Sequence, residues 1–320
     1  MTASEIKEHA RALGFDACGI APAAGHPELT FFREWLDRGY AADMAYLQRS
    51  ADRRADVRNV LPNARTVIVT STVYHTDRPY SVECADRGRA QIARYAWGDD
   101  YHDVIGARLE RLLEWMRSRS AAPFDARAYV DTGPVQERVY AQHAGIGWIG
   151  KNTCVISPTL GSWTFLGVII CSLSLDVDAP ALDQCGSCTL CIEACPTQAI
   201  VAPGVLDSTR CISYLTIEHR GDIPAEHHAG IGSHVYGCDV CQEVCPWNAV
   251  APRSGDPAWQ PRPAWDAVDL ATLSERTDDE LAAALRGSPM RRAKAHGLRR
   301  NVAIALSNAQ TAVETGTERR

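Results

Sequence analysis

The chain has 320 residues, 46% of them apolar, and a formal net charge of −6; this predicts a globular protein with a hydrophobic core and about two domains. Several charges fall in the first twenty residues and no apolar run approaches the roughly 20 residues of a membrane span, so we expect a cytoplasmic protein with no membrane partner. The negative net charge does not by itself favour a nucleic-acid partner, so local patches must support one.

The first sixty residues predict two helices, a strand and a charged loop. Thr2 and Glu5 have the spacing of a capping box, before apolar residues at helical spacing. Residues 17–20 fit a strand, and residues 31–36 fit a second helix. Four arginines follow between residues 46 and 62: Arg49, Arg53, Arg54 and Arg58. They belong either to a solvated loop or to an anion clamp in a cleft.

Strands then alternate with helices. Residues 66–73 are a β-branched run typical of a buried strand, and residues 105–116 carry an apolar helical stripe. Residues 128–131 predict another strand, 135–144 a helix and 163–170 a third strand. The alternation predicts a layered α/β domain over residues 1–175, without fixing the strand order.

Residues 176–183 form a polar, Pro-containing connector into a cysteine-rich segment. We place a second domain over residues 176–252 and a helical C-terminal segment over residues 253–320. In that segment, residues 278–285 and 290–306 predict two helices, and about the last ten residues are expected to fray.

Eight of the twelve cysteines lie between residues 185 and 245. Three follow one another at Cys-x2-Cys spacing, a fourth comes at x3, and proline follows it, which is the bacterial ferredoxin pattern for two [4Fe-4S] clusters. Because the fourth cysteine of each run binds the other cluster, we assign one cluster to Cys185, Cys188, Cys191 and Cys245, and the second to Cys195, Cys211, Cys238 and Cys241. Zinc sites or disulfides are the alternatives. The other four cysteines are expected to be buried small hydrophobes.

Asp131 is the candidate acid, because it closes an apolar strand just before Gly133 and Pro134. Ligands of open α/β sheets bind at the carboxyl ends of strands, and a half-buried carboxyl there would have a raised pKa and act as a proton donor. The alternative is a helix cap for the helix that begins near Pro134.

Two further motifs are less specific. Residues 100–106 differ by one residue from a motif that ligates cobalamin cobalt through histidine, and a helix that begins at Asp100 explains them as well. Residues 145–152 are glycine-rich and fit a close backbone approach to a flat cofactor, with Lys151 placed to meet an anionic group.

A basic run near the C-terminus carries five positive charges and no acid: Arg291, Arg292, Lys294, Arg299 and Arg300. On a helix these would form either a solvated basic face or a contact to nucleic-acid phosphates. From Arg253 onward eleven basic residues stand against nine acidic ones, which favours RNA or DNA.

Taken together, the motifs resemble the epoxyqueuosine reductase family. The resemblance covers nearly the whole chain and is carried by residues 53–56, 61–65, 95–102, 130–133, 144–152, 210–216, 236–239 and 245–248. It implies an α/β (α+β layered) cobalamin-binding domain, a ferredoxin-like domain with two [4Fe-4S] clusters and a short C-terminal helical segment.

The resemblance also implies the reaction. Two [4Fe-4S] clusters and base-off cobalamin reduce the epoxide of epoxyqueuosine to queuosine at the wobble position of tRNA, with Asp131 as proton donor and an external electron donor, in a protein expected to be monomeric. Arg54 matches a cobalamin contact, Arg138 lies where the family approaches tRNA, and further cofactor contacts fall on Lys151, Ser213, Tyr236 and Asp239.

Gly232-Ser233-His234 departs from the family, in which an arginine is often found. One competing interpretation is a cobalamin-dependent reductive dehalogenase, although those enzymes typically carry a twin-arginine signal that is not found here. The other is an iron-sulfur electron-carrier subunit with no substrate site.

Overall fold

The computed structural model describes residues 1–314, and its internal contacts divide the chain into two compact units. The first unit comprises residues 1–75, 101–188 and 246–253, and the second comprises residues 76–100, 189–245 and 254–320. Each unit therefore combines three separate stretches of the chain. The division at residues 175 and 252 into three domains stays a prediction.

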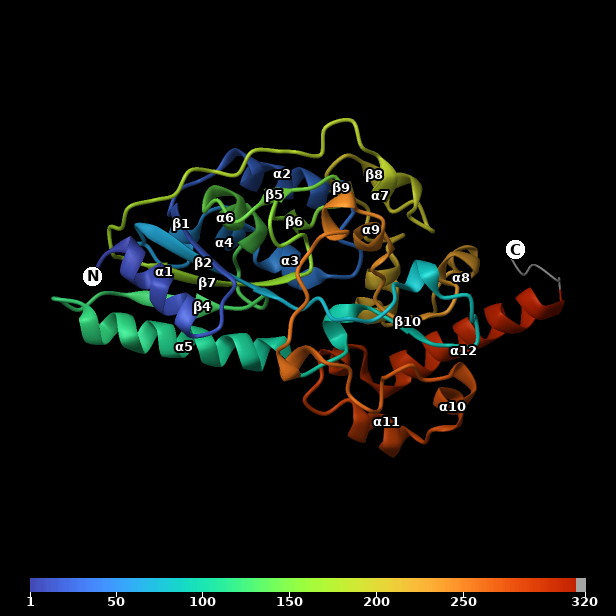
Figure 1. Ribbon diagram of the computed structural model, residues 1–320. Helices are drawn as coiled ribbons and strands as arrows, with labels where there is room; N and C mark the ends of the chain where they lie inside the picture. The colour runs from blue at the N-terminus through green and yellow to red at the C-terminus, as the bar shows by residue number, and fades with distance from the viewer. Residues whose placement is uncertain (315–320) are drawn as a thin grey trace. The chain divides into compact units, whose positions relative to one another are not determined.

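A four-stranded sheet organises the first unit (Figure 1). Its strands run in the order β1 (Ala17–Pro22), β2 (Thr66–Val73), β7 (Thr164–Cys171) and β4 (Ala126–Tyr129). Every neighbouring pair is antiparallel, with Thr66 opposite Cys171 and Val73 opposite Thr164 in the central pair. The layered arrangement is confirmed, but the domain is α+β, because the β-branched pattern of a buried strand does not specify the direction of its neighbours.

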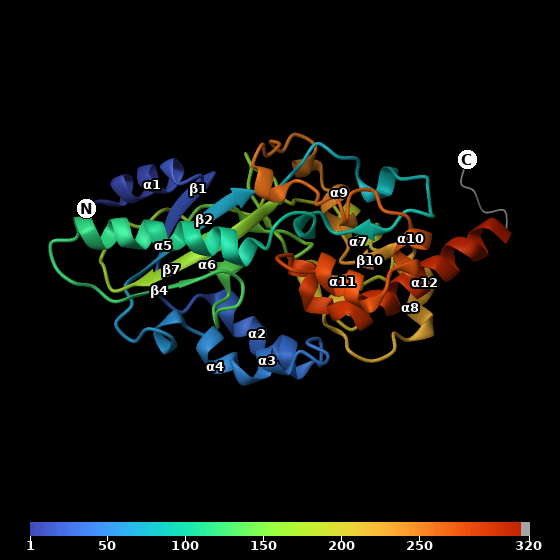
Figure 2. The same ribbon diagram turned by 90° about the horizontal axis from the view of Figure 1, so that it is seen from below.

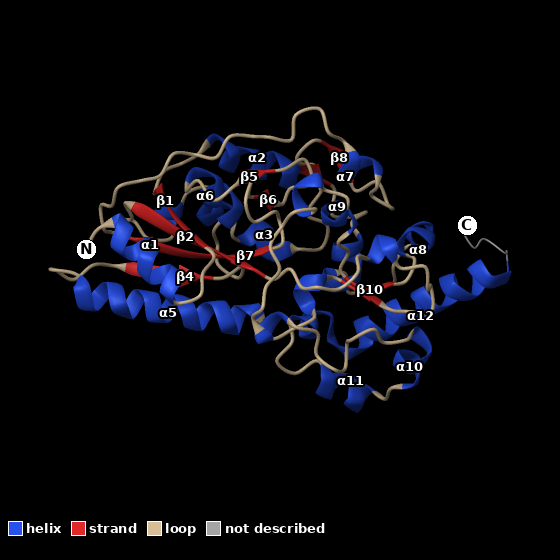
Figure 3. Cartoon of the chain, in the orientation of Figure 1, coloured by secondary structure: helices blue, strands red, loops and turns tan. Residues whose placement is uncertain are grey.

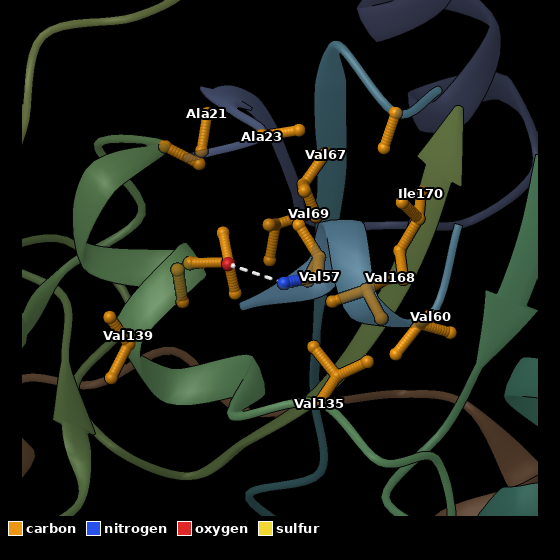
Figure 4. Close-up of a cluster of buried hydrophobic side chains, with 14 of the residues drawn as sticks. Ala21, Ala23, Val57, Val60, Val67, Val69, Val135, Val139, Val168 and Ile170 are labelled. Atoms are coloured by element: carbon orange, nitrogen blue, oxygen red, sulfur yellow. Dashed lines mark hydrogen bonds between the residues drawn. The ribbon is translucent and has the colours of Figure 1, made fainter. Parts of the chain in front are cut away.

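Helices cover both faces of this sheet, which explains why all eight residues of β2 are buried. Figure 2 shows α5 (Tyr101–Arg119) lying along β7 and β4, and α1 (Ala3–Ala12) packs beside it on β1. On the other face, α6 (Glu137–His143) packs on β1, β2 and β7. Figure 4 shows the core on the α6 side, where Val67 and Val69 of β2 meet Val168 and Ile170 of β7.

The remaining elements of the first unit are short. The capping box is confirmed, since the backbone N–H of Glu5 donates to the side-chain oxygen of Thr2 at 3.3 Å. The charged stretch over residues 46–62 forms helices rather than an open loop. The remaining helices and strands of the first unit are α2 (Pro27–Asp37), α3 (Ala45–Arg49), α4 (Ala51–Arg54), β5 (Trp148–Ile149) and β6 (Val155–Ile156).

The second unit is made of several short helices, two-stranded pairs and one long helix, α12 (Lys294–Glu314; Figure 3). The strands are β3 (Gln91–Ile92), β8 (Ile200–Ala202), β9 (Val205–Leu206) and β10 (His234–Tyr236). The helices are α7 (Leu190–Glu193), α8 (Ala225–Ile231), α9 (Val240–Glu243), α10 (Leu270–Glu275), α11 (Asp278–Ala284) and α12 (Lys294–Glu314). Its core includes Tyr236, Leu281 and Leu298.

The helix expected over residues 290–306 is interrupted, so that prediction was wrong at its start. A 3-10 turn, Pro289–Ala293, comes first, and Lys294 then has a φ of +60° before α12 continues to Glu314. Arg291 and Arg292 therefore do not share one helix face with Arg299 and Arg300. α12 includes residues 311–314, residues 315–320 lie outside the described residues, and the expected fraying stays a prediction.

No helix within residues 1–314 combines the length and the apolar character needed to cross a membrane.

Gly19 of β1 allows α6 to lie directly against the sheet, since a Cβ at this position would stand 2.0 Å from the carbonyl oxygen of Ala144. We expect Gly19→Ala to lower the melting temperature, because backbone must move to relieve the clash. Gly106→Ala on α5 is the matched control. Its Cβ would meet nothing within 4 Å, so helix propensity should raise the stability by about 0.5–1 kcal/mol. Equal melting temperatures of wild type and Gly19→Ala would contradict this packing.

Candidate active site and cluster-binding segment

Asp131 lies in a constrained loop between β4 and α6. Its φ is +57°, a left-handed conformation that costs energy for a residue with a Cβ. The backbone N–H of Asp131 donates to Oε1 of Glu137 at 2.7 Å. Gly133 packs so closely on the ring of Tyr129 that a Cβ would approach it to 2.4 Å. The first residue of α6 and the last of β4 thus hold the loop.

The carboxylate of Asp131 faces the start of α5. The hydroxyl of Tyr101 donates to Oδ2 at 3.0 Å, and Nε2 of His102 lies 3.7 Å from the same oxygen. The helix-start interpretation of residues 100–106 is confirmed by α5. The helix-cap alternative for Asp131 is wrong, since Gln136 precedes α6 and no side chain caps that helix.

The expected raised pKa of Asp131 is not found. Surrounding protein atoms disfavour the charged form, but the nearby His102 ring and the hydrogen bond from Tyr101 outweigh this effect and hold the pKa of Asp131 below its ordinary value. The side chain remains 70% exposed, so the carboxylate is crowded by protein but accessible to a ligand. It is therefore charged at neutral pH.

Glu137 is a candidate site residue that the sequence analysis missed. Burial, and then the negative charge of Asp131, raise the pKa of Glu137 well above its ordinary value. It is therefore the neutral member of a carboxyl pair whose other member, Asp131, is charged. Two carboxyls whose surroundings drive their pKa values apart are typical of catalytic sites.

Arg54 and Arg138 lie near the same end of α6. Nη1 of Arg54 donates to the carbonyl oxygen of Val135 at 3.0 Å and its Nε to Oγ of Ser50 at 2.9 Å. Burial lowers the pKa of Arg54, while the charge of Asp131 opposes that effect. Arg138 is exposed, and its Nη1 donates to the carbonyl oxygen of Thr153 at 2.7 Å. The structure thus brings Arg54 and Arg138 to the candidate acid.

Among the described residues, none of the eight cysteines of the predicted cluster set forms a disulfide. In the second unit, α7 and α9 are single helical turns that carry Cys191 and Cys241, and these two turns pack against each other. Both cysteine runs therefore meet, as required if each cluster takes ligands from both. Burial raises the pKa of the thiols of Cys211 and Cys238; iron would displace their protons, because it binds the thiolate.

The predicted cofactor residues Lys151, Ser213, Tyr236 and Asp239 contact protein atoms. The ammonium of Lys151 donates to the carbonyl oxygens of Gly186 and Cys188 at 2.7 and 2.9 Å, and Ser213 bonds the thiol of Cys211.

Tyr236 and Asp239 lie inside the second unit. The hydroxyl of Tyr236 donates to the carbonyl oxygen of Pro289 at 2.8 Å. The carboxylate of Asp239 accepts the backbone N–H of Arg94 at 2.5 Å, and burial, followed by the charge of Glu243, raises its pKa to about 7. Their roles as cofactor contacts stay predictions.

The C-terminal basic residues divide into two groups. Arg292 pairs with Glu218 and Arg299 with Asp278, each at 2.7 Å. Arg300 donates to the carbonyl oxygens of Leu215 and His219. Arg291 and Lys294, in contrast, are exposed, and their side chains pair with no acid or carbonyl among the described residues. Contacts of these five residues with tRNA stay predictions.

Comparison with known proteins was consistent over the whole chain. A family described as epoxyqueuosine reductase QueG matches residues 54–132, and a 4Fe-4S double cluster binding domain matches residues 184–248. The chain therefore carries a domain for two [4Fe-4S] clusters. An epoxyqueuosine reductase of Gloeobacter violaceus is 44% identical over 95% of this chain and 96% of its own length, and one of Xanthomonas campestris is 40% identical over 96% and 87%.

Solved structures give the same result. A crystal structure of epoxyqueuosine reductase with an epoxyqueuosine-modified tRNA-Tyr stem loop matches with a TM-score of 0.88 and 31% identity, over 97% of this chain and 82% of that one. The epoxyqueuosine reductase of Streptococcus thermophilus matches with a TM-score of 0.84 and 28% identity, over 98% and 83%. Sequence and fold therefore agree that this chain belongs to the epoxyqueuosine reductase family.

Proposed function

We propose that this protein reduces the epoxide of epoxyqueuosine in the wobble position of tRNA to the alkene of queuosine. The observation that carries the proposal is the placement of Asp131, on a constrained loop between Glu137 and the Tyr101–His102 pair, in a chain 40–44% identical to epoxyqueuosine reductases. A relative of known structure binds an epoxyqueuosine-modified tRNA stem loop. The reaction consumes two electrons and two protons and releases the epoxide oxygen as water.

The electrons enter through the two clusters. We assign the first to Cys185, Cys188, Cys191 and Cys245, and the second to Cys195, Cys211, Cys238 and Cys241, as the spacing predicts. Each cluster carries one electron at a time, so an external one-electron donor must deliver two. The packing of α7 on α9 supports ligation from both runs.

Cobalamin is the second proposed cofactor. Some of the residues predicted to contact it have side chains that are suited to this role. Arg54 is half-buried beside the acid and keeps a guanidinium group suited to the polar periphery of a corrin. Lys151 and Tyr236 donate to backbone carbonyls, and Arg54 does so too through Nη1, but neither Lys151 nor Tyr236 bonds to Asp131. When bound, cobalamin supplies a strongly reducing cobalt centre. We therefore propose Arg54 and Asp131 as its principal contacts.

Asp131 has the task of protonating the oxygen that leaves the carbon skeleton. The hydrogen bond from Tyr101 and the nearby ring of His102 favour the charged form, so the proton must be loaded before each turnover. His102, 3.7 Å from the carboxylate, is the neighbouring side chain whose imidazole can take up and release a proton. Proton delivery by a positioned acid contributes about 10²–10⁴-fold to the rate.

Asp131→Asn removes the transferable proton but keeps the shape of the side chain. We expect conversion of epoxyqueuosine-containing tRNA, measured by nucleoside analysis after anaerobic incubation with reductant, to fall by about 10²–10⁴-fold, at unchanged iron content. Asp103→Asn, on the exposed first turn of α5, is the control and should convert normally. If Asp131→Asn converts this tRNA as fast as wild type, Asp131 is not the acid.

The raised pKa of Glu137 has a consequence for stability. As pH rises above 4.5, the ordinary pKa of a glutamate, Glu137 loses its proton in the unfolded chain but keeps it in the folded one. The free energy of unfolding therefore decreases with pH until the pH exceeds the pKa of Glu137 in the folded chain. Glu137→Gln cannot ionise. Its melting temperature relative to wild type should therefore increase between about pH 4 and pH 8. Exposed Glu114→Gln should show no such trend, and a flat difference for Glu137→Gln would contradict a neutral Glu137.

If Arg138 contacts a tRNA phosphate, Arg138→Gln should reduce the slope of log affinity against log salt by about one. Arg127→Gln, an exposed arginine on β4, serves as the matched control. Binding of a tRNA anticodon stem loop measured at several salt concentrations gives both slopes. Equal slopes for wild type and Arg138→Gln would exclude the contact.

A further inference from the structure

The indole N–H of Trp148 points at a proposed cluster ligand. Nε1 of Trp148 lies 3.4 Å from Sγ of Cys185 and donates a hydrogen bond to it. The side chain is only 1% exposed, and Trp148 pairs with Ile156 in the β5–β6 hairpin. Its ring also packs edge-on against Trp247, with centroids 5.0 Å apart. The ring is therefore fixed, and the N–H remains directed at the sulfur.

Lys151 holds the same cysteine loop from the turn of the hairpin. Its ammonium donates to the carbonyl oxygen of Gly186 at 2.7 Å and to that of Cys188 at 2.9 Å. Both acceptors are neutral, so these bonds do not cancel the positive charge. Gly186 has a φ of +51°, which suits glycine. A full positive charge is thus tied to the backbone between the first two cysteines.

Trp247 links this arrangement to the second cysteine run. It follows Cys245 by two residues and contacts the same indole that bonds Cys185. Trp148 therefore serves the one cluster to which Cys185 is assigned.

Both groups favour the reduced form of that cluster. Reduction adds one electron and converts [4Fe-4S]²⁺ to [4Fe-4S]⁺, which places more negative charge on the ligand sulfurs. Hydrogen bonds to the sulfurs and the local charge are among the factors that set the potential of such clusters. An N–H donor and a nearby cation stabilise the added electron and so raise the potential.

We propose that Trp148 and Lys151 are positioning residues that raise the reduction potential of the cluster at Cys185 above the value its four thiolates alone would give. The proposal rests on the cluster assignment under "Proposed function" and not on the substrate or on cobalamin. A merely structural tryptophan would contribute packing, which phenylalanine largely retains, whereas the proposed role requires the N–H group.

The test is a redox titration of the full-length chain with both clusters, under anaerobic conditions, with dithionite as reductant and electron paramagnetic resonance as readout. In Trp148→Phe, the ratio of reduced to oxidised cluster at a fixed potential should fall by about tenfold for one cluster only, a shift of about 59 mV. Lys151→Met should shift the same cluster in the same direction. Trp115→Phe is the matched control, because Trp115 stacks on His9 rather than beside a cysteine, and should shift neither cluster.

An unchanged potential in fully loaded Trp148→Phe, or an equal shift of both clusters, overturns the proposal. Should this variant fail to retain iron, wild-type protein labelled with ¹⁵N-indole tryptophan provides the second measurement. Hyperfine coupling between a ¹⁵N nucleus and one reduced cluster supports the proposal, and its absence overturns it. Neither measurement uses tRNA, so failure here is distinguishable from failure to reduce epoxyqueuosine.

Discussion

The hydrogen bond from the backbone N–H of Asp131 to Glu137 is the constraint on which the candidate active site depends. A left-handed aspartate costs about 1–3 kcal/mol, and this bond, together with the packing of Gly133 on Tyr129, offsets the cost. The loop follows β4 at one side of the sheet. Glu137 comes from α6 on one face, and Tyr101 and His102 come from α5 on the other. Asp131 is thus held by residues from α6 and α5, the helices on the two faces of the sheet.

The different surroundings of Glu137 and Asp131 explain why these two carboxyl groups can lie next to each other. Desolvation of its carboxyl raises the pKa of Glu137 well above the ordinary value, which favours the neutral form beside Asp131. Asp131 is accessible and receives hydrogen bonds from the opposite side. The difference between the two surroundings separates their pKa values and gives each a distinct task. Glu137 holds the loop, and Asp131 exchanges protons in the proposed reaction.

Local patterns predicted the parts of the structure that depend on neighbours in sequence. The β-branched run gave β2 with its bounds at Thr66 and Val73, and cysteine spacing indicated a double-cluster domain that the family comparison confirms. Features set by distant partners could not be predicted. The pKa of Asp131 falls because Tyr101 and His102 reach it from thirty residues upstream, and Arg299 and Arg300 bond to Asp278 and Leu215 instead of forming an open basic face. Strand direction is likewise decided by long-range packing.

Within the first unit, the segment from α6 to β6 contacts both the loop of the proposed proton donor, Asp131, and the loop of a proposed cluster ligand, Cys185. Its first residue holds the Asp131 loop, and its hairpin holds the Cys185 loop through Trp148 and Lys151. Two internal bonds stiffen it: Arg138 donates to the carbonyl oxygen of Thr153 at 2.7 Å, and the backbone N–H of Ile149 donates to Gln142 at 3.1 Å. Because this segment holds both loops, a shift of it would displace Asp131 and Cys185 together.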